Sequence, residues 1–169
     1  RLERADFIVL THGHSDHLGD SARLAQKYGA TVVAMFEIVA YLGGQGVDKA
    51  EPMNIGGTVE RDGLAFTMVN ALHSSAIVED GKPVTMGDPA GFVIKTPERH
   101  AYHAGDTEIF SDMALIQRLH KPTVGLLPVE ERLAVFEKVL DAAEWFGWMP
   151  EGRLSCLPVR FEIALHQGD

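Results

Sequence analysis

Cysteine is almost absent from this sequence, since only Cys156 occurs among its 169 residues. A single thiol excludes an internal disulfide and is consistent with a reducing compartment. Long apolar runs are also missing, because the longest, such as TVVAMF, fall far short of the roughly 20 residues that span a bilayer. We therefore expect a cytoplasmic protein that does not bind or span a membrane. We expect Cys156 to be a small buried apolar residue.

Basic side chains are few: 15 lysines and arginines stand against 24 aspartates and glutamates, which gives a formal net charge of −9. They are also scattered and form no basic stripe that could neutralise a run of phosphates. This balance argues against a nucleic-acid partner and favours a small-molecule substrate. A local positive centre, such as a bound metal, can still override the average charge.

The composition is that of an ordinary globular protein, with 46% hydrophobic and 23% charged residues. The length allows one domain with a sizeable core and is too short for two domains of usual size. We see no internal repeat, low-complexity segment or long linker. We therefore expect residues 1–169 to form a single domain.

Strands and helices alternate along the sequence. Residues 6–11 are a continuous apolar run that ends at a polar cluster, which predicts a buried strand. Residues 20–29 have the spacing of a short amphipathic helix, with Asp20 or Ser21 as its cap and Gly29 as its end. Such alternation predicts a layered α/β sandwich. The other expected elements are strands at 31–35 and 123–129, helices at 37–46, 110–121 (capped by Ser111) and 130–146, hairpins at 58–69 (turn at Asp62-Gly63) and 91–106, and short strands within 153–169.

The stretch THGHSDHLGD follows the apolar run FIVL and crowds metal-binding side chains into one loop. Beyond the end of a strand, alternate side chains can point into one cavity, so that His12 and His14 share one cation while Asp16 and His17 face a neighbouring one. Gly13 allows the tight turn between the first two ligands. Neutral imidazoles and carboxylates suit Zn²⁺, Fe²⁺ or Mn²⁺. The alternative is a solvated polar loop that contains histidines without binding a metal.

This motif is the signature of the metallo-β-lactamase superfamily, and later stretches resemble it too. NALHSS supplies His73 and YHAGDT supplies Asp106, each after an expected strand and at about the spacing that the superfamily uses. Together with MNIGGTV, GFVIKT and YHAGDTEIFSDM, these motifs resemble the uncharacterised bacterial and archaeal metal-dependent hydrolases of that superfamily, which are related to ascorbate-phosphate lactonases. The resemblance covers approximately residues 1–128.

The resemblance implies an αββα sandwich with two divalent ions, zinc foremost and manganese or iron as alternatives. A hydroxide held between the ions would attack a small ester, lactone, amide or phosphodiester. Asp16 and His103 are the candidate catalytic residues, and His103 is the group that would protonate a leaving group. The implied metal ligands are His12, His14 and His73 on one ion, Asp16 and His17 on the second, and Asp106 as a bridge between the two.

Several of these residues have simpler interpretations. His73 is alternatively a core histidine, and Asp106 a helix cap before TEIF. His103 is alternatively a hydrogen-bond partner of a metal ligand, or a surface or packing residue. Ser74 and Ser75 either hydrogen-bond a substrate or simply finish the strand.

The sequence departs from the family pattern at both ends. Only about ten residues precede the histidine loop, where the superfamily has several strands, so we expect the N-terminal strands of one sheet to be missing. An exposed sheet edge would then allow a homo-oligomer to form. The final histidine of the family, commonly in a Pro-Met-His context, is not evident, and His166 is the only later histidine.

Two other functions stay open at this point. A truncated or degenerate member of the superfamily would bind metal, or a partner, without turnover, and both departures favour it. A diiron oxidoreductase on the same fold is the second, but such proteins usually carry Glu where His14 stands, and no flavin module is present.

Overall fold

The computed structural model describes residues 2–128 and 163–165, which form four helices and eleven strands. The helices are α1 (Ser15–Leu18), α2 (Ser21–Tyr28), α3 (Phe36–Gly43) and α4 (Asp112–His120). The strands are β1 (Phe7–Val9), β2 (Thr31–Met35), β3 (Ala50–Met53), β4 (Thr58–Arg61), β5 (Leu64–Asn70), β6 (Ala76–Glu79), β7 (Lys82–Thr85), β8 (Ala90–Lys95), β9 (His100–His103), β10 (Val124–Leu126) and β11 (Ile163–Leu165).

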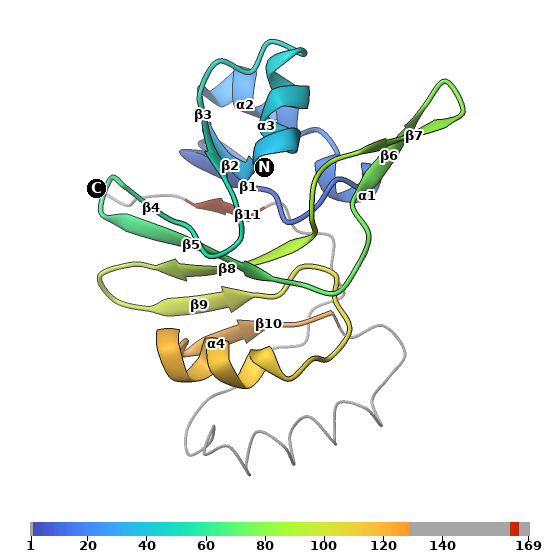
Figure 1. Cartoon of the computed structure of the whole chain (residues 1–169). Helices are drawn as coiled ribbons and strands as arrows, with labels where there is room; N and C mark the ends of the chain where they lie inside the picture. The colour runs from blue at the N-terminus through green and yellow to red at the C-terminus, as the bar shows by residue number, and fades with distance from the viewer. Residues whose placement is uncertain (1, 129–162, 166–169) are drawn as a thin grey trace.

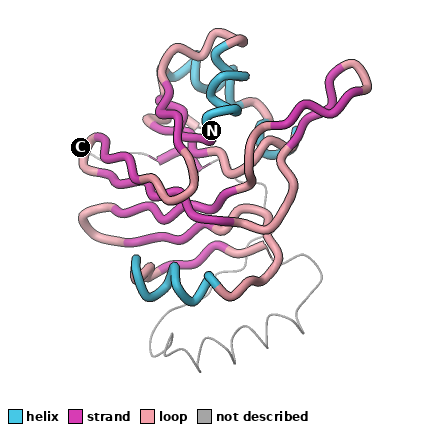
Figure 2. The backbone as a smooth tube through the Cα atoms, viewed as in Figure 1, coloured by secondary structure: helices cyan, strands magenta, loops and turns pink. Residues whose placement is uncertain are grey.

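Two sheets lie between outer helices. One has the strand order β11-β1-β2-β3, and the other has the order β10-β9-β8-β5-β4. Figure 1 shows α2 and α3 on the outer side of the first sheet and α4 on the outer side of the second. The tube in Figure 2 shows the same four layers: helices, a sheet, a second sheet and a helix. The α/β sandwich expected from the sequence is therefore confirmed.

The apolar sequences of β1 and β2 follow from their positions in the first sheet. β1 pairs with β2 in parallel, and β2 pairs with β3 in parallel. Parallel strands covered on both faces are expected to be apolar throughout, and β1 and the last four residues of β2 are buried without alternation. β11 pairs with β1 in antiparallel orientation, so the tail contributes one of the short strands expected within 153–169.

The facing sides of the two sheets meet in an aromatic contact. The rings of Phe7 in β1 and Phe66 in β5 lie 5.1 Å apart, and these residues are 1% and 0% exposed. On the opposite face of the second sheet, Val93 and Tyr102 pack with Ile116 of α4. The second sheet is therefore covered on both faces, by the first sheet and by α4.

Truncation of Phe66 tests this inter-sheet core. We expect Phe66→Ala to lower the free energy of unfolding by about 3–5 kcal/mol, because it removes a fully buried ring and leaves a cavity. Phe36→Ala is the matched control, since Phe36 is 57% exposed and its loss should change stability by less than about 0.5 kcal/mol. Urea denaturation of both variants measures the difference, and equal losses would contradict this packing.

Local turn chemistry agrees with the sequence at two positions. α2 ends where Gly29 adopts a left-handed conformation with φ 65°, and the Gly29 N–H donates to the Ala25 carbonyl. The hairpin of β4 and β5 turns at Asp62 and Gly63, both with positive φ, as tight two-residue hairpins require. The hairpin of β8 and β9 also forms as expected.

Other local expectations were wrong or incomplete. Asp20 and Ser111 occupy the N-cap positions of α2 and α4 as expected, but neither side chain makes a capping hydrogen bond. The helix α1 within the histidine loop was not expected. β3 was also missed because it contains Pro52, which is tolerated at a sheet edge where one side needs no backbone donor. The helix expected at 130–146 lies outside the described residues, as do Cys156 and His166.

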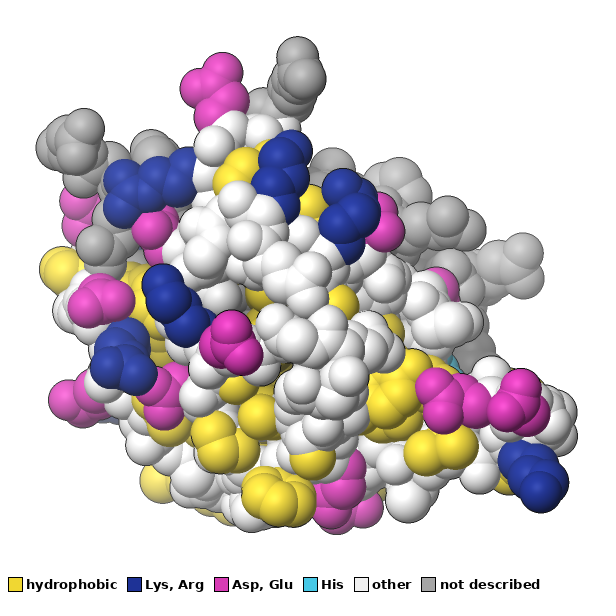
Figure 3. All heavy atoms as spheres, turned by 90° about the horizontal axis from the view of Figure 1, so that it is seen from above, with side chains coloured by type: hydrophobic (Ala, Val, Ile, Leu, Met, Phe, Trp, Pro, Cys, Tyr) yellow, Lys and Arg dark blue, Asp and Glu magenta, His cyan; other side chains and the backbone are white. Residues whose placement is uncertain are grey.

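No helix among residues 2–128 and 163–165 is long and apolar enough to cross a membrane. Figure 3 views the molecule from the side of α2 and α3 and shows lysine and arginine side chains interspersed with aspartate and glutamate. On that face the cations form no continuous basic surface.

Candidate metal centre

The histidine loop leaves the end of β1 and is fixed to neighbouring strands by its backbone. The Leu10 N–H donates to the Val33 carbonyl of β2, and the Thr11 carbonyl accepts from the Ala90 N–H of β8. These two bonds join the loop to both sheets. His12, the next residue, is 0% exposed, so its imidazole is surrounded by protein atoms and not by solvent.

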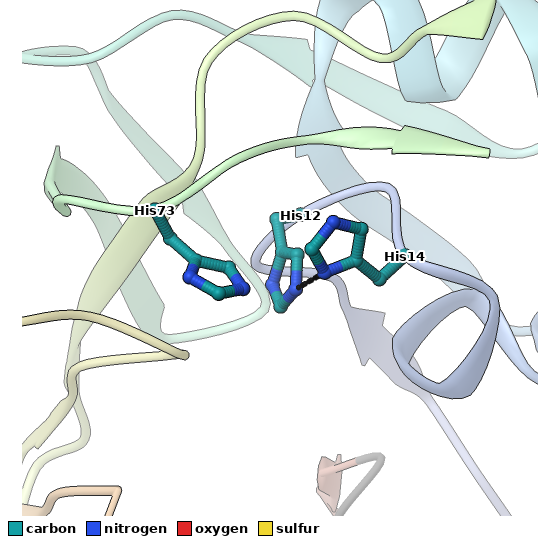
Figure 4. Close-up of side chains that lie close together, drawn as sticks. All are labelled: His12, His14 and His73. Carbon is teal, nitrogen blue, oxygen red and sulfur yellow. Dashed lines mark hydrogen bonds between the residues drawn. The ribbon is translucent and has the colours of Figure 1, made fainter. Parts of the chain in front are cut away.

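Three imidazoles converge beside this loop, as Figure 4 shows. Nε2 of His12 lies 3.0 Å from Nδ1 of His14. The ring of His73, which follows β5, lies 5.0 Å from the ring of His12 and 4.9 Å from that of His14. One ligand atom from each of the three lies within 4.8 Å of the others.

A second group shares His12 with the first. His12, His17 and Asp106 each offer a ligand atom within 4.8 Å of the others. Nε2 of His17 lies 3.1 Å from Oδ2 of Asp106, and Nε2 of His73 lies 3.9 Å from the same oxygen. Asp106 therefore stands between His17 of the second group and His73 of the first.

Asp16 lies at the margin of these groups and belongs to neither of them. Its carboxylate is 63% exposed, and its Oδ2 lies 3.7 Å from Nε2 of His17. The reason is α1: successive side chains of a helix are turned about 100° from one another, so Asp16 and His17 do not face the same point. The structure thus brings together five of the six ligands implied by the resemblance and leaves the sixth beside them.

Two alternatives raised by the sequence are wrong. Asp106 is not a helix cap, because α4 begins six residues later, at Asp112. His73 is not a core histidine, since its side chain is 35% exposed. Both side chains are therefore accessible at the candidate site.

The charges of the site suit a cation. Burial, and then the neighbouring His17, lowers the pKa of His12 to about 3, so its ring is neutral near pH 7. The hydrogen bond from His17 lowers the pKa of Asp106 and keeps this carboxyl ionised. The same hydrogen bond raises the pKa of His17. A buried neutral imidazole and an ionised carboxylate are the protonation states that metal ligation requires.

His103 lies at the end of β9 and is not part of either group. Its Nδ1 accepts a hydrogen bond from the Gly105 N–H at 3.1 Å, so the proton of the neutral ring is on Nε2. Burial lowers the pKa of His103, and the charges of His17 and Asp106 also act on it. A neutral ring near pH 7 favours a hydrogen-bonding role over proton donation to a leaving group.

Sequence reasoning missed the residues that support the loop. Oγ1 of Thr11 lies 3.1 Å from Nδ1 of His12. Oγ of Ser75 accepts a hydrogen bond from the Gly13 N–H at 3.0 Å. The HSS motif marks the two serines, but their contacts reach residues some sixty positions earlier, which no local pattern reveals.

Gly13 is required where the loop packs on Met86. A Cβ at position 13 would overlap Cβ and Cγ of Met86, a buried side chain. We expect Gly13→Ala to destabilise the fold by about 1–3 kcal/mol through overpacking and to weaken metal binding. The control is Gly43→Ala, where the new Cβ meets nothing within 4 Å. Thermal unfolding with and without zinc compares them, and an unchanged Gly13→Ala variant would contradict this packing.

The donor set fits a divalent cation of the zinc type. Zinc–nitrogen bonds in proteins are about 2.0–2.1 Å long, so nitrogens 3.0 Å apart can reach one ion. Imidazole nitrogens with a carboxylate oxygen also suit iron and manganese. His12 is common to both groups, and Asp106 lies close to a histidine of each.

Residues 1–137 match the family of the beta-lactamase superfamily domain, and the chain belongs to that family. The UPF0173 metal-dependent hydrolase of Methanopyrus kandleri is 50% identical over 133 residues, which are 79% of this chain and 58% of that protein. Its counterpart from Brucella canis is 48% identical over 130 residues, 76% of this chain and 55% of that protein. The chain therefore spans less than three fifths of these relatives.

A solved structure has the same fold. Igni18, a metallo hydrolase from the archaeon Ignicoccus hospitalis, superposes with a TM-score of 0.68 at 33% identity, over 83% of this chain and 59% of Igni18. The αββα architecture implied by the motifs is thus confirmed by an independent structure.

Proposed function

We propose that this chain forms the metal-binding part of a dinuclear metal-dependent hydrolase that acts on a small molecule. The convergence of three imidazoles and the His17–Asp106 pair around the buried ring of His12 carries this proposal. The likeness to relatives named as metal-dependent hydrolases supports it.

One ion would be held by His12, His14 and His73. The second would be held by His17, with Asp106 shared between the two ions. Asp16, beside His17, is the further candidate ligand of the second ion. Bound there, divalent cations would act as Lewis acids on a carbonyl or phosphoryl oxygen and lower the pKa of water. Zinc suits this donor set best, and manganese and iron remain within its range.

The protein residues have separate tasks in this proposal. His12 supplies a neutral nitrogen from a water-excluded position, because burial depresses its pKa. Asp106 supplies negative charge that offsets the cations. His103 presents its Nε2–H as a hydrogen-bond donor, while Gly105 occupies its Nδ1. These roles fit ester, lactone, amide or phosphodiester hydrolysis, in which charge develops on an oxygen.

The net charge of −9 and the scattered cations support small substrates over nucleic acid, and the single cysteine supports a cytoplasmic location. We also propose that the chain forms a homo-oligomer through an exposed sheet edge.

A substrate panel tests the proposed activity. The zinc- or manganese-loaded chain is assayed with a nitrophenyl ester, a γ-lactone, an anilide and bis(4-nitrophenyl) phosphate. We expect turnover of at least one substrate that a chelator abolishes and added metal restores, because the cations supply the Lewis acid. His73→Gln should lose this turnover, whereas His120→Gln, at the end of α4 and outside both ligand groups, should retain it. Turnover that is insensitive to the chelator, or none with metal bound, would contradict the proposal.

A further inference from the structure

His12 and His14 each have a hydroxyl group beside the ring nitrogen that points away from the other histidine. Nε2 of His12 and Nδ1 of His14 face one another at 3.0 Å. The other nitrogen of His12 lies 3.1 Å from Oγ1 of Thr11, and the other nitrogen of His14 lies 3.0 Å from Oγ of Ser74. The same arrangement therefore occurs twice, with hydroxyls from two separate segments.

This arrangement bears on which nitrogen of His14 binds a cation. A neutral imidazole carries one N–H and one lone pair, and only the lone pair can ligate a metal. A hydroxyl can accept the N–H of Nε2, which leaves the lone pair on Nδ1, the atom that faces His12. Histidines that bind metals commonly donate their other N–H in this way, and the partner fixes both tautomer and ring orientation.

Ser74 is itself held against the histidine loop through its neighbour. The buried Oγ of Ser75 accepts from the Gly13 N–H and donates to the Met86 carbonyl at 3.3 Å, while the Met86 N–H donates to the Ser75 carbonyl at 2.9 Å. Gly13 directly precedes His14. The segment that carries Ser74 is therefore joined to the residue before the ring that Ser74 contacts.

We propose that Ser74 is a positioning residue, whose hydroxyl fixes the ring of His14 with Nδ1 directed at the first metal ion. This inference rests on the proposed metal-dependent function and adds to it a residue that does not touch the cation. The two adjacent serines then have different roles: Ser74 orients the ring of His14, and Ser75 anchors the backbone at Gly13.

Ser74 allows a cleaner test than Thr11. Thr11 is buried, its carbonyl bonds to β8, and its side chain crowds Gly105, so substitution there would disturb the fold. Ser74 is exposed, and its hydroxyl contacts His14. Ser15 is the matched control: it directly follows His14, is exposed, and its hydroxyl makes no hydrogen bond to another described residue.

The experiment compares wild type, Ser74→Ala, Ser74→Thr and Ser15→Ala in the full chain. Zinc affinity is measured by competition with a chromophoric chelator, and thermal midpoints are measured without metal. Long-range ¹⁵N spectra of the histidine rings report the tautomer of His14. We expect Ser74→Ala to bind the first zinc about tenfold more weakly, with a metal-free midpoint close to that of wild type. Ser74→Thr, which keeps the hydroxyl, and Ser15→Ala should bind zinc as wild type does, and His14 should carry its proton on Nε2 in wild type.

Wild-type affinity in Ser74→Ala would overturn the inference and leave the metal site intact. Equal weakening in Ser74→Thr and Ser74→Ala would overturn it too, because the hydroxyl would then be irrelevant. A wild-type chain that binds no zinc would instead overturn the proposed function, on which the inference rests.

Discussion

Replacement of His12 by phenylalanine is expected to remove the first cation and to weaken the binding of the second. His12 supplies the buried nitrogen of the first ion, and its ligand atom also lies within 4.8 Å of those of His17 and Asp106. Its loss therefore takes one ligand from the first ion and leaves Asp106 without the ion that it would share with the second. Phenylalanine fills a similar volume in a position that is 0% exposed, and therefore the fold should tolerate it better than a polar side chain. Metal content per chain should fall from about two to one or less, and hydrolytic turnover should fall at least about 100-fold, because removing even a residue that only supports a ligand costs 10–100-fold.

His120→Phe is the control, since His120 ends α4 and belongs to neither group. Both variants are measured by elemental analysis after equilibration with zinc, with circular dichroism to check that the fold persists. A folded His12→Phe chain that retains two ions would contradict the assignment of His12 to the first ion.

Asp106→Asn is expected to remove the second ion and to leave the first in place. The first group keeps all of its imidazoles and should still bind one cation, whereas the second group loses the charged oxygen that lies 3.1 Å from Nε2 of His17. Asparagine retains the size of the side chain but carries no charge to offset two cations. We expect metal content to fall from about two to about one, with a loss of turnover of at least about 100-fold if catalysis needs both ions.

The matched control is Asp112→Asn, an exposed carboxylate in the first turn of α4. It should keep both ions and full turnover. Equal metal content in the wild type and in Asp106→Asn would contradict the bridging position of Asp106, and a loss of both ions would contradict the independence of the first group.

The fold could be predicted from the sequence because its signals are local. β1 and β2 are continuous apolar runs, Gly29 ends α2, and Asp62-Gly63 makes a hairpin turn. Each signal depends on residues within a few positions of one another. The hairpin of β6 and β7 had a similar signal in Asp80-Gly81, both at positive φ, but its strands are short and mostly exposed, so their apolar pattern is weak.

The candidate site was predicted less completely, for a physical reason. The spacing of the histidine loop predicts that alternate side chains point in one direction. The structure instead begins α1 at Ser15, which turns Asp16 outward and places His17 beside Asp106. A four-residue helix depends on its tertiary contacts rather than on its own sequence, and no spacing rule could reveal it.

The supporting contacts were beyond prediction because they join distant segments. The bond from Gly13 to Ser75 spans 62 positions, and the bond between His14 and Ser74 spans 60. Sequence reasoning could note the serines but not their partners. The proposed orientation of the His14 ring depends on its contact with Ser74, which the ligand motif alone does not reveal.

The metal content of the wild-type chain tests the central claim most directly. The chain is purified without chelator, equilibrated with zinc, passed through a desalting column and analysed by inductively coupled plasma mass spectrometry against protein concentration. The two ligand groups predict about two equivalents of zinc per chain. One equivalent would contradict the dinuclear arrangement, and none would contradict the proposal that this chain is part of a metal-dependent hydrolase.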